Sequence, residues 1–198
     1  SHEGSVRIVG GRLRGRALAA PGAAGGGAAH LRPTADRVRE SLFNLLAHGG
    51  YAEPPAPEGM RVLDLFAGIG ALGLEALSRG ARFCLFVDDH GPSRALIRGN
   101  VEALGLIGAS RVYRRDALRL GPCRGAAHQL VFLDPPYRSG LAAPALRAAA
   151  EGGWLAPKAL AVIESAAEER AAPPEGFVEE DRRRYGETEI LVLRRAAG

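Results

Sequence analysis

The sequence predicts an α/β protein with a seven-stranded, mostly parallel sheet and an antiparallel hairpin at one edge. From residue 60 onward, short apolar runs typical of buried strands alternate with segments of helical periodicity. Such alternation is the pattern of a doubly wound parallel sheet covered by helices. The last segment, 176–195, differs because it indicates two strands joined directly near the sequence YGET.

The predicted elements of this core follow one another without an internal repeat. The apolar runs predict parallel strands, and the segments between most of them predict helices, one of which is closed by Gly80. The strands are expected at 61–66, 82–89, 110–117, 129–136 and 159–165, and the helices at 70–80, 92–105 and 141–153.

A shorter N-terminal extension precedes this core. Residues 6–18 are expected to form a hairpin with Gly10 and Gly11 as its turn, and 19–30 form a Gly/Ala-rich loop. Residues 32–48 predict a helix with Thr34 as its N-cap. We therefore divide the chain into a basic arm with its helix, residues 1–52, and a core domain, residues 53–198.

Composition limits the possible classes of protein. The chain has 198 residues, 46% hydrophobic and 24% charged, which suits one soluble domain with a full core. It contains no apolar run of membrane-spanning length and no apolar leader segment. Cys84 and Cys123 are isolated, so we expect reduced thiols and a cytoplasmic location. No cluster has metal-ligand spacing, so no metal is expected.

Positive charge is concentrated at the N-terminus. The net charge is +4, and residues 1–39 contain seven arginines against two acids. A basic arm on a nearly neutral body favours a polyanionic partner such as nucleic acid, the alternative being a solvated tail.

Acidic residues stand at the ends of four consecutive predicted strands. They are Asp64, Asp88 with Asp89 beside it, Asp116 and Asp134. Ligands of open α/β sheets bind beyond the carboxyl ends of the strands, so these carboxylates are expected to line one crevice.

The first loop of the core carries Gly68, Gly70 and Gly73 between a strand and a helix. This spacing alone matches a dinucleotide site, with Asp88 as the ribose acid. Asp64, however, would be a poor neighbour for a pyrophosphate, whereas it suits the ammonium of S-adenosylmethionine.

S-adenosylmethionine gives each acid a role. Asp64 would lie near the ammonium, Asp88 would accept the ribose hydroxyls, and Asp116 would accept the adenine amine. Asp89 stands directly beside Asp88 and is an alternative ribose ligand.

The sequence Asp134-Pro135-Pro136-Tyr137 resembles the motif of methyltransferases that act on exocyclic amines of nucleobases. Asp134 and the Pro135 carbonyl would accept the amine hydrogens, and the fixed φ of both prolines would aim that carbonyl. Tyr137 would stack on the base. Either Asp134 or water would take the released proton.

The resemblance extends along nearly the whole chain. The segments RIVGGRLRGRAL, RPTADRVRESLFNLL, VLDLFAGIGALGLEALSRGA, LVFLDPPYRSGL and GWLAPKALAVIES are similar, in order and spacing, to the bacterial 16S rRNA guanine-N2 methyltransferases of the guanine-966 type. This resemblance implies a Rossmann-like class I methyltransferase fold and S-adenosylmethionine as methyl donor. It implies 16S rRNA, in an assembled or partly assembled small subunit, as partner. Because no apolar stretch demands a protein partner or spans a membrane, we expect a monomer that does not bind membranes.

The resemblance also implies roles for individual residues. Arg12, Arg14 and Arg16 would bind phosphates, and Arg32, Thr34 and Arg37 would lie over the entrance of the active site. A solvated helix face is the alternative for Arg37 and Arg39. The implied cofactor-binding residues are Asp64, Phe66, Ala67, Gly68, Gly70, Asp88, Asp89, Asp116, Ala117 and Asp134.

Three other functions account for part of these observations. A DNA adenine or cytosine methyltransferase would share the Asp134–Tyr137 motif but would need a separate DNA-reading domain. A non-catalytic RNA-binding module would not need the cofactor residues. A nicotinamide dehydrogenase would leave the motif unexplained.

Overall fold

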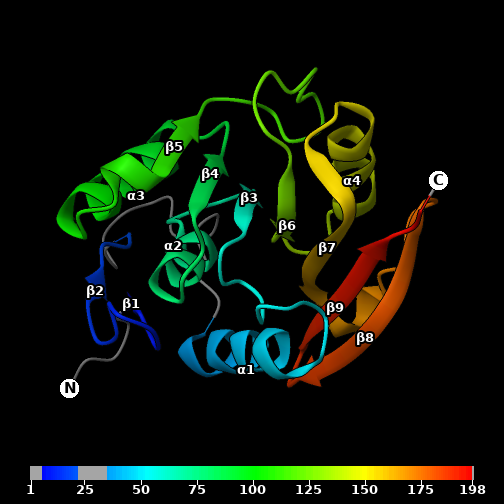
Figure 1. Cartoon of the computed structure of the whole chain (residues 1–198), viewed down its shortest axis with the longest axis horizontal. Helices are drawn as coiled ribbons and strands as arrows, with labels where there is room; N and C mark the ends of the chain where they lie inside the picture. The colour runs from blue at the N-terminus through cyan, green and yellow to red at the C-terminus, as the bar shows by residue number, and fades with distance from the viewer. Residues whose placement is uncertain (1–5, 22–34, 198) are drawn as a thin grey trace.

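The computed structural model describes residues 6–21 and 35–197 (Figure 1). One seven-stranded sheet, with strand order β5-β4-β3-β6-β7-β9-β8, forms the centre of the molecule. Strands β5, β4, β3, β6 and β7 are mutually parallel, and β9 runs antiparallel to both β7 and β8. The predicted parallel sheet with an antiparallel edge hairpin is therefore confirmed. The strands are β3 (Arg61–Leu65), β4 (Phe83–Val87), β5 (Ser110–Tyr113), β6 (His128–Leu133), β7 (Leu155–Ala166), β8 (Phe177–Tyr185) and β9 (Thr188–Arg195).

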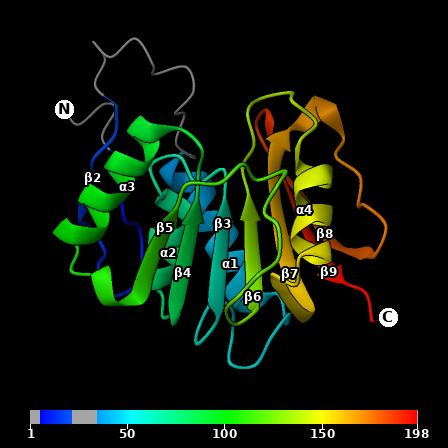
Figure 2. The ribbon, with the colours of Figure 1, turned by 90° about the horizontal axis from the view of Figure 1, so that it is seen from above.

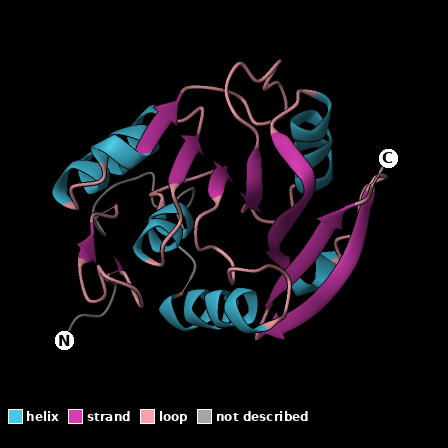
Figure 3. Ribbon diagram, in the orientation of Figure 1, coloured by secondary structure: helices cyan, strands magenta, loops and turns pink. Residues whose placement is uncertain are grey.

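Helices cover both faces of this sheet (Figures 2 and 3). Helices α1, α2 and α3 contribute their buried apolar side chains to one core cluster, and α4 contributes to a second cluster on the opposite face. The helices are α1 (Asp36–His48), α2 (Ala71–Ser78), α3 (Gly91–Ala103) and α4 (Ala142–Glu151), with short 3-10 turns η2 (Ile107–Ala109) and η3 (Ala167–Glu169). No helix in the described ranges is long and apolar enough to cross a membrane.

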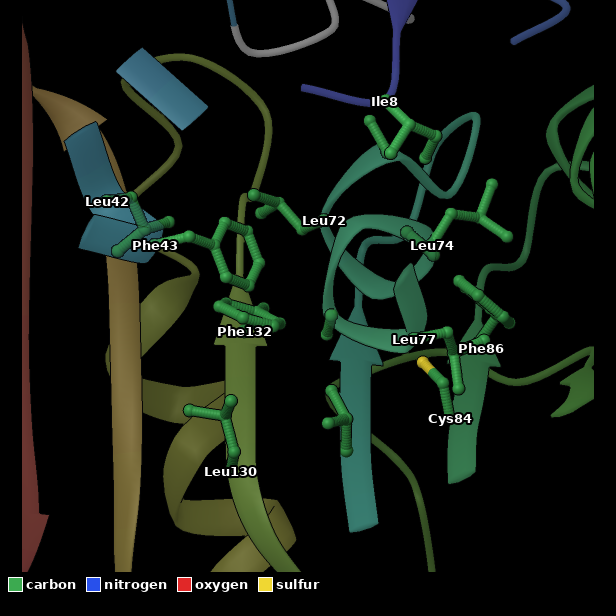
Figure 4. Close-up of a cluster of buried hydrophobic side chains, with 14 of the residues drawn as sticks. Ile8, Leu42, Phe43, Leu72, Leu74, Leu77, Cys84, Phe86, Leu130 and Phe132 are labelled. Atoms are coloured by element: carbon green, nitrogen blue, oxygen red, sulfur yellow. The ribbon is translucent and has the colours of Figure 1, made fainter. Parts of the chain in front are cut away.

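The core under α1 and α2 is packed with large apolar side chains (Figure 4). Phe43 of α1 meets Phe132 of β6 with ring centroids 5.6 Å apart, and both side chains are fully buried. Phe86 and Cys84 of β4 lie under α2, where Gly73 leaves room for them. A Cβ at Gly73 would stand 2.4 Å from the Phe86 ring and 2.6 Å from the Cys84 sulfur. The third glycine of the sequence motif therefore serves close packing of α2 on the sheet.

The N-terminal arm is docked on α2 and α3 as far as the structure describes it. Strands β1 (Val6–Arg7) and β2 (Ala17–Leu18) form a small antiparallel hairpin. The predicted turn at Gly10 and Gly11 is wrong, because the connection runs through residue 15, whose N–H donates to the Ile8 carbonyl. Gly10 and Gly11 instead lie against α2, where a Cβ on Gly11 would stand 2.0 Å from the Ser78 carbonyl oxygen. The alternative of a solvated tail does not hold for residues 6–21.

A buried ionic network joins this arm to the core. Arg39 of α1 and Glu75 of α2 are both fully buried, with 3.0 Å between Arg39 Nε and a Glu75 carboxylate oxygen. The Glu75 carboxylate also accepts backbone N–H groups of Val9 and Gly10 and pairs with Arg79. The solvated-face alternative for Arg39 is therefore wrong, since its charge is neutralised inside the protein.

Several predicted boundaries differ from the observed ones. Asp64 is not the last residue of its strand but lies inside β3. Strand β5 ends at Tyr113, so Asp116 follows it at a distance of three residues. Helix α1 has Ala35 at its N-cap position without a side-chain cap, and Thr34 lies outside the described residues. Tertiary packing and chain direction after each strand, rather than local pattern, decide these ends.

Candidate active site

A cavity of about 640 Å³ opens where β3, β4, β6 and β7 end. The glycine loop after β3, the acids after β4 and the loop after β6 line it, together with the first turn of α1 and the start of β9. Its size falls within the roughly 300–1,000 Å³ of small-molecule sites. The titratable residues in the lining are Asp64, Asp88, Asp89, His90, Asp134, Tyr137, Glu164, Glu169 and Glu187.

The charged side chains of the cavity lining are predominantly acidic. Among the described residues, seven aspartates and glutamates line this cavity and no arginine or lysine does. Such a lining suits a ligand with positive charge and disfavours a phosphate or pyrophosphate. The cavity therefore fits S-adenosylmethionine, whose sulfonium and ammonium are cationic, better than a dinucleotide.

Asp64 lies at the bottom of the glycine loop. Asp64 is only 1% exposed, and one of its carboxylate oxygens accepts the Gly73 N–H at 3.0 Å. Burial raises the pKa of Asp64, which the Gly73 hydrogen bond opposes and the nearby charge of Asp88 reinforces. Because Asp64 binds the first turn of α2, it orients the helix N-terminus toward the cavity as well as contributing charge.

The glycine loop has an unusual backbone. Phe66, Gly68 and Gly70 have φ values of 57°, 61° and 83°. Gly70 is the N-cap of α2, and its left-handed conformation turns the chain from the strand into the helix. Phe66 holds a left-handed conformation that costs a non-glycine residue free energy, as is frequent at ligand sites.

Asp88 closes this loop from the next strand. Its two carboxylate oxygens accept the N–H groups of Gly68 and His90, each at 2.9 Å. A carboxylate has about four lone-pair directions, so each oxygen can accept one further donor such as a ribose hydroxyl. Asp89 is exposed beside it and also lines the cavity. The geometry thus fixes the orientation of Asp88 more firmly than that of Asp89.

Asp116 and Ala117 lie outside the lining of this cavity. Asp116 is exposed, and its carboxylate accepts the Leu118 N–H at 2.9 Å, whereas Ala117 is buried. The structure therefore does not place these two residues together with the other predicted cofactor residues.

The loop after β6 places the predicted catalytic motif at the cavity. Asp134, Pro135, Pro136 and Tyr137 all line it, and Tyr137 is 58% exposed. The Tyr137 hydroxyl donates to Glu168 at 3.3 Å, and the Arg138 guanidinium lies 5.3 Å from the ring centroid and pairs with Glu168. An exposed aromatic ring at the edge of a site is available for stacking on a planar ligand.

Glu164 is a site residue that the sequence analysis missed. It lies in β7, lines the cavity and is hydrogen-bonded to Asp134. The available signal was its position after the apolar run ALAVI, which repeats the pattern of an acid after a buried strand.

Three of the predicted RNA-binding arginines lie away from the cavity. Arg12, Arg14 and Arg16 are exposed, and backbone or side-chain groups of Arg12 and Arg16 contact the C-terminal ends of α2 and α3. The cavity lies at the opposite, N-terminal ends of these helices. Arg37 is exposed on the first turn of α1, and Arg32, like Thr34, lies outside the described residues.

The strand order β5-β4-β3-β6-β7-β9-β8 and the cavity lined by carboxyl groups at the carboxyl ends of the parallel strands together define a class I methyltransferase. Within that class, the chain belongs to the family described as Conserved hypothetical protein 95, whose sequence model matches residues 6–194.

Comparison with known proteins supports this assignment. The chain is 43% identical to the Ribosomal RNA small subunit methyltransferase D of Escherichia coli over 169 residues, which are 85% of this chain and 78% of that protein. It superposes on the solved structure of the Escherichia coli protein yhhF with a TM-score of 0.81 at 34% identity, covering 98% of this chain and all of that one. The fold also matches SMU.776, solved with SAH, at 17% identity with a TM-score of 0.61, over 80% of this chain and 48% of that one.

Proposed function

We propose that the protein transfers a methyl group from S-adenosylmethionine to the N2 amine of a guanine, of the guanine-966 type, in 16S rRNA. The observation that carries this proposal is the position of Asp134–Tyr137 on the lining of a cavity rich in carboxylates. The 43% identity to a small subunit methyltransferase supports rRNA as the substrate. We further propose an assembled or partly assembled small subunit as the form methylated, and a monomeric, cytoplasmic enzyme.

The residues of the cavity divide into a donor part and an acceptor part. Asp64, the glycine loop and Asp88 would hold S-adenosylmethionine, which supplies an electrophilic methyl group on a sulfonium. Asp134 and the Pro135 carbonyl would hold the amine, and Tyr137 would stack on the guanine at the open side. We retain the proposed contact of Asp116 with the adenine amine, since Asp116 follows β5 at the same edge of the sheet.

Both parts act by orientation. An exocyclic amine is a weak nucleophile because its lone pair is delocalised into the ring, so acceptors on its two hydrogens favour a localised lone pair. Positioning of that lone pair in line with the methyl group supplies most of the rate enhancement in such reactions.

The substrate partner would contact two parts of the chain. We propose that residues 1–52 form an RNA-binding unit and 53–198 the methyltransferase domain. The exposed Arg12, Arg14 and Arg16 would bind phosphates far from the target guanine, and Arg37, with Arg32 and Thr34, would bind RNA near the cavity. Such spacing suits a structured particle, in which RNA segments lie against both places.

The decisive experiment is transfer of labelled methyl from S-adenosylmethionine to small subunits from cells that lack this gene. Digestion to nucleosides should give N2-methylguanosine from one site. Label in free rRNA but not in subunits would overturn the assembled particle as substrate. Label in DNA as methyladenine or methylcytosine would replace rRNA by DNA, and failure to bind S-adenosylmethionine in calorimetry would favour a binding module.

A further inference from the structure

Glu164 is a cavity carboxylate to which the proposed function assigns no role. Strands β6 and β7 are parallel, and Leu133 of β6 pairs with Ile163 of β7. The next residues along the two strands are Asp134 and Glu164. The register of the sheet therefore places Asp134, which directly follows β6, beside Glu164 within β7.

The two acids also point to the same face of the sheet. Phe132 and Val162 belong to the core cluster under α1, and the residues that follow them belong to the cluster on the opposite face. Because side chains alternate along a strand, Asp134 and Glu164 return to the face of Phe132 and Val162. Both line the cavity there.

A hydrogen bond between the two carboxyl groups requires a proton. Asp134 and Glu164 share a side-chain hydrogen bond, which two ionised carboxylates cannot form. Burial raises the pKa of Asp134 well above its ordinary value, and the charges of Glu164 and Asp64 raise it further. Two neighbouring carboxyl groups whose charges repel each other therefore favour a state with one proton and one negative charge.

The surroundings strengthen this effect. The first turn of α1 contributes only Ala35 and Val38 to the lining, so it brings no charge that would stabilise a second carboxylate. Among the described residues, the other titratable groups of the cavity lining are Asp64 of β3, Asp88, Asp89 and His90 after β4, Tyr137 on the loop of Asp134 itself, Glu169 of η3 and Glu187 before β9.

We propose that Glu164 is a positioning residue that shares one proton with Asp134 and keeps that carboxyl ready to accept the proton released on methylation. The inference rests on the proposed function, whose acceptor group it completes. When the shared proton moves to Glu164, the Asp134 carboxylate can accept a hydrogen from the amine. In this proposal Asp134, rather than water, is the group that accepts the released proton.

The step balances in atoms and charge. The amine lone pair forms the new N–C bond while the C–S bond breaks and its electron pair stays on sulfur. The positive charge passes from sulfur to nitrogen, which then carries one proton in excess. Asp134 takes this proton, the pair becomes neutral with two protons, and one proton afterwards leaves to solvent.

The test is the pH dependence of the single-turnover rate on small subunits that lack the modification. In Glu164→Gln the charge of Glu164 is removed while an N–H still donates to Asp134. We expect the acid limb of the profile to move to lower pH by on the order of one unit. Glu164→Ala has no group that donates a hydrogen bond to Asp134. At pH values above the acid limb, its rate should therefore be lower than that of Glu164→Gln. An unmoved acid limb, or equal rates for the two variants, would overturn the proposal.

The matched control is Glu187→Gln, which removes a carboxylate of the same cavity that is not among the groups raising the pKa of Asp134. Its acid limb should stay where it is in the unaltered protein. A movement equal to that of Glu164→Gln would show an effect of net charge and contradict the proposal.

An infrared titration of the free protein tests the pair without any substrate. A protonated-carboxyl band should persist at neutral pH and should weaken in both Asp134→Asn and Glu164→Gln. An unchanged band in both variants would contradict the shared proton even if methylation is found. A weakened band in a protein that methylates nothing would support the pair and overturn the proposed function instead.

Discussion

Two pairs of ionisable side chains, one fully buried and one half-buried at the cavity, differ in the sign of their charges. Arg39 and Glu75 are oppositely charged, fully buried and surrounded by further hydrogen bonds. Asp134 and Glu164 are both acids, and burial raises the pKa of Asp134. One pair closes the junction between arm, α1 and α2, and the other faces a cavity.

This difference separates a structural role from a functional one. A compensated pair leaves little to gain from a ligand, whereas two acids that share a proton gain from any cation or proton donor that enters. Removing one member should therefore harm stability in the first pair and activity in the second.

The largest expected effect is on stability, in Glu75→Gln. The change removes the buried carboxylate beside the Arg39 guanidinium and leaves the partly exposed Asp36 as its ion-pair partner, and the hydrogen bonds to Val9 and Gly10 weaken. We expect a loss of about 3–5 kcal/mol in the free energy of unfolding, measured by urea denaturation. The exposed Glu175→Gln should lie within about 0.5 kcal/mol of the unaltered protein. Equal stability of both variants would contradict a structural role for Glu75.

The second effect is on activity, in Asp134→Ala. Loss of a preorganised acceptor should lower the methyl-transfer rate by about 10²–10³-fold or more. The affinity for S-adenosylmethionine, measured by calorimetry, should change by no more than a few fold, because the proposed contacts of the cofactor lie mainly on the glycine loop and Asp88. A large loss of cofactor affinity would contradict the assigned role.

A third effect concerns the pH dependence of stability. Since the pKa of Asp134 is raised in the folded protein, folded chains bind more protons than unfolded ones above the unfolded pKa of about 4. The contribution is thus fully present below that pH and is lost as pH rises through the folded pKa. Asp134→Asn should remove this loss. The melting temperature of the variant minus that of the unaltered protein should therefore increase as pH rises from 4. A constant difference across pH would count against a shared proton.

The smallest effect concerns arginines that, unlike Arg39, keep their charge exposed. Substitution of Arg12, Arg14 and Arg16 by alanine should weaken binding to small subunits and leave the fold intact. The slope of log affinity against log salt should fall by about 0.7–0.9 for each phosphate that the variant no longer binds. Substitution of Arg111, Arg114 and Arg119, which are exposed elsewhere, is the matched control. The same slope in both triple variants would argue against the arm as an RNA-binding element.

Much of the fold could be predicted because it rests on local patterns. Apolar runs of strand length, helical periodicity and the final pair of adjacent strands determine the sheet and its edge hairpin. The acids after β4 and β6 could be located as well, since each follows directly on a buried strand. The role of Arg39 could not be predicted, because an arginine on a helix has the same sequence pattern whether it is solvated or paired with Glu75 across 36 residues.

Sequence alone therefore determined the order of strands and helices, the glycine loop, the Asp134–Tyr137 motif and the likeness to a methyltransferase family. Each of these depends on neighbours within a few residues, whose spacing is set by covalent geometry. Only the tertiary structure decided that Asp116 lies outside the cavity, that the arm is docked on α2, and that Glu164 lies beside Asp134. Those facts depend on strand register and burial, which bring together residues that are distant in the chain.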